Sequence, residues 1–209
     1  MLNNDQKDAL REYIGLYIGQ AASLLSEMIE RRVHLMIPDI ELVRSNIDAI
    51  ETHRYFSFLD GYVVSSSIGF GTDFSGKAKL YFPKDKIKAL VTLCIGEEAD
   101  DIELDLTETD FDAIHEIGNI ILNAIVGSMG NLVNVKLNYS IPEVNVVFFP
   151  EEAKRLFEEN KTKNTHLLII RNVFTVEEAN VEGAIIVVLS MEAMNVLMEK
   201  IDQVLNDLM

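Results

Sequence analysis

The sequence predicts an α/β protein of the α+β type, a single domain over residues 1–209 with long helices packed on a largely antiparallel sheet. Long stretches with helical apolar spacing alternate with short β-branched runs, and tight turns join those runs, which favours antiparallel pairing. The order of the expected elements in the first half recurs in the second half. We therefore predict two repeats, about residues 5–96 and 109–209, related by an internal pseudo-two-fold axis.

Composition excludes several classes of protein. A hydrophobic content of 48% is that of an ordinary globular chain, and the net charge of −16 argues against nucleic acid and against anionic membranes as partners. A single cysteine, Cys94, rules out an internal disulfide and suits a reducing cytosol. No stretch is long and apolar enough for a signal core or a membrane span. We expect a cytoplasmic protein.

The first repeat is expected to begin with a helix over residues 5–31, capped by Asn4 or Asp5. A strand around Pro38, a short helix over 43–52, two strands joined by a turn and a helix ending near Gly96 should follow, and an acidic connector leads on to Asp110. Five apolar or aromatic residues share one face of the first helix: Leu10, Tyr13, Tyr17, Ala21 and Leu24.

The second repeat is offset from the first by 104 positions, which is the separation of Glu116 from Glu12 and of Pro142 from Pro38. It should contain a helix over about Phe111–Met129, a strand with Pro142, a short helix, two strands and a closing helix. The recurrence of both spacing and order is what indicates one duplicated unit.

The helix over Phe111–Met129 carries an unusual polar stripe. At about 100° per residue, Asp112, Glu116, Asn119 and Asn123 fall on one side, without Lys or Arg. The opposite, core-facing side consists of Ile114, Ile117, Ile121, Ala124, Ile125 and Ser128. Asparagine is a poor helix former, so two of them within the helix do not serve stability. The stripe is therefore the candidate functional site.

The spacing Asp112-x3-Glu116-x2-Asn119-x22-Pro142 resembles the signature of the CheC/CheX/FliY family of chemotaxis phosphatases, and of its CheC-like members in particular. Those proteins remove the phosphoryl group from the aspartate of a CheY-type receiver domain. The resemblance covers nearly the whole chain and implies the same architecture, with two long helices side by side on one surface. It implies a phosphorylated CheY-type receiver as partner. It also implies the receptor deamidase CheD as a possible partner, although no residue of the chain indicates whether CheD binds.

The resemblance assigns roles to the stripe: Asn119 orients the attacking water, and Glu116 docks onto a lysine of the receiver. The receiver supplies magnesium, so the phosphatase needs no metal or cofactor of its own. An amide suits the first role, because it can both accept from and donate to water and adds no negative charge beside the phosphoryl group. Asp112 either caps the helix together with Thr109 or contacts the partner. Asn123 either extends the contact surface or is simply solvated.

The first repeat keeps only part of this pattern. Glu12 retains the carboxylate, but Gly15 and Gly19 stand where the second repeat has Asn119 and Asn123. We therefore predict a lapsed first site at Glu12 and Gly15, and a single functional helix. The alternative is a non-catalytic interaction module of the same fold, such as a flagellar-switch-like or adaptor protein. The Glu116–Asn119 pair argues against it, because a pure binding surface has no need of that pair.

Overall fold

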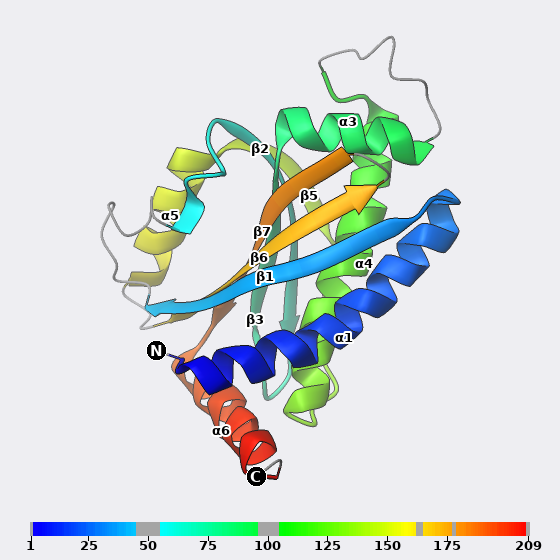
Figure 1. Ribbon diagram of the computed structural model, residues 1–209. Helices are drawn as coiled ribbons and strands as arrows, with labels where there is room; N and C mark the ends of the chain where they lie inside the picture. The colour runs from blue at the N-terminus through cyan, green and yellow to red at the C-terminus, as the bar shows by residue number, and fades with distance from the viewer. Residues whose placement is uncertain (1, 45–54, 96–104, 162–164, 177–178, 208–209) are drawn as a thin grey trace.

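The computed structural model describes residues 2–44, 55–95, 105–161, 165–176 and 179–207 (Figure 1). Its strands form one sheet in which every pairing is antiparallel, and helices cover both faces. The predicted fold class is confirmed. The strands are β1 (Val33–Arg44), β2 (Tyr62–Gly71), β3 (Gly76–Pro83), β4 (Asn138–Tyr139), β5 (Glu143–Phe148), β6 (His166–Val176) and β7 (Ala179–Leu189). The helices are α1 (Asn4–Ile29), α3 (Lys84–Ile95), α4 (Glu108–Leu132), α5 (Phe149–Lys161) and α6 (Met191–Asp207).

Alternate residues of the central strands bury opposite faces of the sheet, as the pleat requires. Leu80 and Phe82 of β3 join the larger core, to which α1, α3, α4 and α6 contribute. Tyr81, between them, joins a second core formed with α5 and Phe56. The two long helices α1 and α4 pack against each other on the first of these faces, as the family resemblance implied.

The strands are ordered β1-β6-β7-β3-β2, and β4 and β5 both pair with the outer side of β2. Exchanging β1 with β5, β2 with β6 and β3 with β7 turns the order β1-β6-β7-β3-β2-β5 into the same order read from the other edge of the sheet. This palindromic order is compatible with the predicted internal repeat, which stays a prediction.

The buried face of α1 differs in part from the prediction. Leu10 and Ala21 are buried as expected, but Leu24 is 57% exposed. The buried stripe is completed instead by Ile14, Ile18 and Leu25. The two tyrosines of the predicted face lie at its edge, where the Tyr17 hydroxyl accepts a hydrogen bond from Nδ2 of Asn131 in α4. The helix cap is neither Asn4 nor Asp5 but Asn3, whose side chain accepts from the backbone N–H of Gln6 at 2.8 Å.

Both proline-containing strands are interrupted, because proline has no N–H to donate to a ladder. The predicted strand with Pro142 is divided into β4 and β5, and β1 changes register between Met36 and Asp39, around Pro38. Two other predictions fall largely outside the described residues. Of the short helix over 43–52, residues 43 and 44 belong to β1 and the rest is not described. Of the acidic connector, the part from residue 108 to Asp110 forms the first turn of α4.

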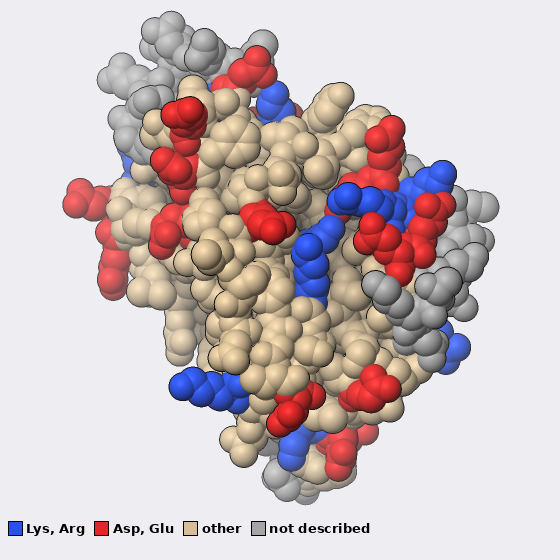
Figure 2. Space-filling view, turned by 180° about the vertical axis from the view of Figure 1, so that it is seen from behind, with Lys and Arg blue, Asp and Glu red and all other residues tan. Residues whose placement is uncertain are grey.

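Charge is unevenly distributed on the surface. Figure 2 shows the side turned away from the viewer in Figure 1, where a broad central area carries few charged side chains. Acidic side chains gather mainly around the rim of this view. The net charge of −16 therefore leaves room for an uncharged contact surface.

Candidate functional site

The N-terminus of α4 is held by a buried ion pair. Lys88 of α3 places its Nζ 2.7 Å from Oδ2 of Asp110, and both side chains are buried. Burial alone would raise the pKa of Asp110, but the hydrogen bonds from Lys88 and Thr107 outweigh it and lower that pKa. Thr107 and Asp110 also form a capping box, in which each side chain accepts from the backbone N–H of the other. The start of the helix is thus fixed to α3.

This arrangement corrects the predicted cap. Thr109 and Asp112 are both exposed, and the cap lies two residues earlier, at Thr107 and Asp110. Sequence reasoning missed Lys88 and Asp110, although the spacing Thr107-x-x-Asp110 was a usable signal. Asp112, which the cap does not need, stays a candidate binding residue.

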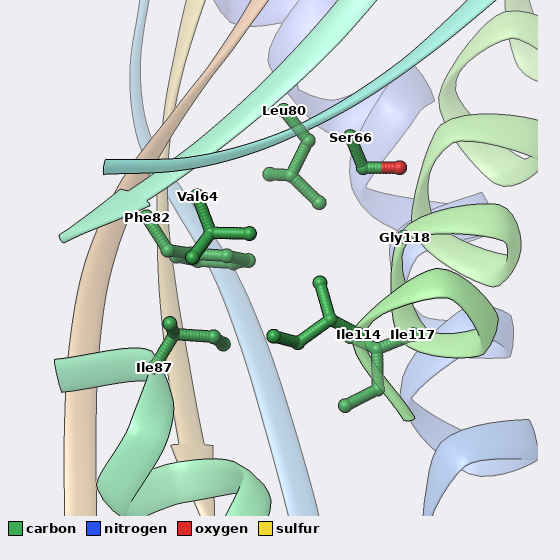
Figure 3. Close-up of a pocket in the computed structure, with 8 residues that line it drawn as sticks. All are labelled: Val64, Ser66, Leu80, Phe82, Ile87, Ile114, Ile117 and Gly118. Atoms are coloured by element: carbon green, nitrogen blue, oxygen red, sulfur yellow. The ribbon is translucent and has the colours of Figure 1, made fainter. Parts of the chain in front are cut away.

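The middle of α4 lies very close to β2. A Cβ added to Gly118 would lie 2.4 Å from Oγ and 2.7 Å from Cβ of Ser66, so only glycine allows this approach. Beside the contact is a small cavity of about 10 Å³, lined mainly by aliphatic side chains such as Ile114 and Ile117. Figure 3 shows the hydroxyl of Ser66 pointing toward the helix at Gly118. Gly118 lies between Glu116 and Asn119, so this contact sets the height of the candidate site above the sheet.

The polar stripe of α4 faces outward as predicted. Glu116 is exposed, and Asn119 and Asn123 are half-buried. Nδ2 of Asn123 donates to Oδ1 of Asn119 at 2.8 Å, so the structure brings the two amides together. The opposite side is buried at every predicted position except Ala124, which is half-buried.

The amide pair lies on the flank of α4 that is turned away from α1. Gly130 comes seven residues after Asn123 and eleven after Asn119, so with 3.6 residues per turn all three project within about 20° of one direction. A Cβ on Gly130 would meet Leu137, which shows that this flank faces the segment leading into β4. Asn131, in contrast, projects toward Tyr17 of α1.

The sheet edge beyond this flank is rich in apolar surface. Five large side chains of β2, β4, β5 and the connection between β4 and β5 are exposed: Tyr62, Tyr139, Ile141, Val146 and Phe148. The rings of Tyr62 and Phe148 also contact each other, with centroids 5.5 Å apart. Tyr62 and Phe148 thus form exposed apolar surface that is contiguous, and such surface is typical of interaction sites.

The predicted lapsed site on α1 is open to solvent. Glu12 is exposed, and a Cβ added to Gly15 or Gly19 would meet nothing within 4 Å. Within the described part of the chain, packing therefore does not require these glycines. Whether the first site has lapsed stays a prediction.

Among the described residues there is no group of three or more His, Cys, Asp or Glu side chains that could hold a metal ion. No helix in the described part of the chain is long and apolar enough to cross a membrane.

A scan against models of protein families finds no match. The chain is 25% identical over 171 residues to the CheY-P phosphatase CheC of Bacillus subtilis, covering 81% of this chain and 79% of that protein. It is 24% identical over 152 residues to the flagellar motor switch phosphatase FliY of the same organism, covering 72% of this chain but only 38% of FliY. 

Solved structures show the same fold. FliY of Thermotoga maritima has a TM-score of 0.73 at 19% identity, with 97% of this chain and 98% of that chain covered. The FliM middle domain of H. pylori has a TM-score of 0.62 at 8% identity, covering 95% and 99% of the two chains.

The protein thus has the fold of the FliY and FliM flagellar proteins. Together with the sequence similarity to CheC and FliY, this confirms the resemblance to the CheC/CheX/FliY family that the motif on α4 predicted.

Proposed function

We propose that the protein is a phosphatase that hydrolyses the phosphoaspartate of a CheY-type receiver domain in chemotaxis signalling, with α4 as its active element. The observation that carries the proposal is the pairing of an exposed carboxylate, Glu116, with an outward-facing amide, Asn119, on a helix fixed at two points. The similarity to CheC, a CheY-P phosphatase, supports it.

The reaction needs little covalent help from the protein. Water attacks the phosphorus, and the bond from phosphorus to the aspartate oxygen breaks. The products are the free aspartate carboxylate and inorganic phosphate, which keeps the oxygen and protons of the water. An acyl phosphate is already activated, so the remaining requirement is a water held in line with the breaking bond. Asn119 would accept a hydrogen bond from this water and donate one toward the phosphoryl group.

Glu116 would act in docking. It lies one helical turn before Asn119, so both side chains can enter one pocket of a partner. An ion pair with the receiver's lysine would place Asn119 over the phosphoryl group, and the apolar sheet edge beyond this flank would add uncharged contact area. Magnesium would come from the receiver. CheD remains a further expected partner, although no residue of the chain indicates that it binds.

The test separates the two roles. Asn119→Ala should abolish phosphate release while binding of the phosphorylated receiver is kept, because the amide acts on water and not in docking. Glu116→Ala should weaken binding to the phosphorylated receiver and should slow release only through misalignment. Near-normal turnover of Asn119→Ala, or unchanged affinity and turnover of Glu116→Ala, would contradict these assignments.

A further inference from the structure

The hydrogen bond between Asn123 and Asn119 restricts the orientation of the amide that we place at the reaction. Nδ2 of Asn123 donates to Oδ1 of Asn119 at 2.8 Å, from one helical turn further along α4. A carbonyl oxygen has two lone pairs. The contact therefore occupies one acceptor site of Asn119 and leaves its second lone pair and its Nδ2 group for a water and a phosphoryl oxygen.

Without such a partner the terminal torsion of asparagine is broad and nearly two-fold, so the oxygen and nitrogen can exchange places. In the exchanged orientation, Asn119 would present an N–H where the water needs an acceptor. We propose that Asn123 is a positioning residue. Its amide N–H holds the Asn119 side chain with Oδ1 turned toward Asn123, and this fixes which atoms of Asn119 face the attacking water. This inference rests on the proposed function and deepens it.

A purely structural role fits Asn123 poorly. Its Oδ1 is buried and has no hydrogen-bond partner within the described structure, and such a group destabilises the folded state. Asparagine within a helix is also less favourable than alanine. Asn123→Ala should therefore unfold at the same temperature as the wild type or at a higher one. A solvent-facing contact role fits no better, because that oxygen is turned away from solvent.

The experiment measures phosphate release at steady state, with the receiver kept phosphorylated by a small phosphodonor. Asn123→Ala should lower kcat about tenfold, because a misplaced reacting group slows turnover, while KM for the receiver stays within about twofold. Asn123→Asp has nearly the same shape but no donor, so its kcat should fall at least as far. Asn123→Gln keeps the amide donor and should recover much of the loss. Asn131→Ala is the matched control, since this asparagine of α4 projects toward Tyr17 instead, and it should leave kcat unchanged.

Receiver binding separates positioning from contact. Asn119→Ala should have no turnover left to lose but should still bind the phosphorylated receiver, and adding Asn123→Ala in that background should leave this affinity unchanged. A weaker affinity there, or a raised KM with unchanged kcat in Asn123→Ala itself, would overturn the inference and assign Asn123 to the contact surface. If Asn123→Ala turns over as fast as the wild type, this inference is overturned but the proposed function is not. Absence of release by the wild type overturns the proposed function, and this inference with it.

Discussion

Replacing Gly118 by alanine should push α4 away from the sheet. The new Cβ would lie 2.7 Å from Cβ of Ser66, whereas carbon atoms in contact are about 3.5–4.0 Å apart. Rotation of the Ser66 side chain toward the neighbouring cavity can move its hydroxyl, but it cannot move its Cβ. The helix and strand must therefore separate by roughly 1 Å, and such overpacking costs about 1–3 kcal/mol.

A control on the same helix isolates that cost. A Cβ at Gly127 would meet only the Tyr139 hydroxyl, at an ordinary 3.5 Å. Gly127→Ala should gain up to about 1 kcal/mol from helix propensity, and Gly118→Ala has the same intrinsic gain. The difference in the free energy of unfolding between the two variants should thus be about 1–3 kcal/mol.

Urea or thermal unfolding measures this difference, at about 2–4 °C in Tm per kcal/mol for a chain of this size. Ser66→Gly removes both atoms that clash, so Gly118→Ala should cost much less stability in that background than in the wild type. Phosphate release should also fall in Gly118→Ala, because Asn119 moves with the helix. If Gly118→Ala is as stable as Gly127→Ala, the close approach of Gly118 to Ser66 does not set the position of α4.

Two further predictions concern the anchor and the first repeat. Asp110→Asn should destabilise the fold by about 3–5 kcal/mol near neutral pH, because Lys88 stays buried without its counter-charge. The pKa of Asp110 is lowered in the folded state, so its contribution is present above the ordinary aspartate pKa and is lost as pH falls through the lowered value. Unfolding curves of wild type and variant should accordingly converge in acid, and a gap that persists there would assign the loss to packing. Gly15→Asn should restore some phosphate release to Asn119→Ala without loss of stability, since nothing lies within 4 Å of a Cβ there, and Glu12→Ala alone should leave turnover unchanged. A changed oligomeric state without restored release would show that this face of α1 serves contact.

The sequence was sufficient for most of the elements and for the outward-facing polar stripe of α4, because both follow from periodicity. It was insufficient where two positions of the helix cap fit the sequence equally well. Thr107-x-x-Asp110 and Thr109-x-x-Asp112 both have the spacing of a capping box. The structure uses the first, in which Asp110 also pairs with Lys88 of a different helix. The Asn123–Asn119 contact depends on side-chain torsions, which spacing does not determine.

Leu24 and Leu25 illustrate the same limit in the core. Both lie near the apolar side of α1, and which of them is buried depends on how α1 packs against α4 and β1. The close approach at Gly118 was equally hidden, because Ser66 is 52 positions away in the chain. Contacts between distant segments therefore decide the details that local patterns leave open.

The most direct test of the proposed phosphatase activity is to add the purified protein to each phosphorylated receiver of its own cell and to follow phosphate release. Release from at least one receiver should be accelerated by the wild type and should return to the spontaneous rate with Asn119→Ala. Binding of a phosphorylated receiver without accelerated release would contradict the proposed activity and would favour a non-catalytic interaction module of the same fold.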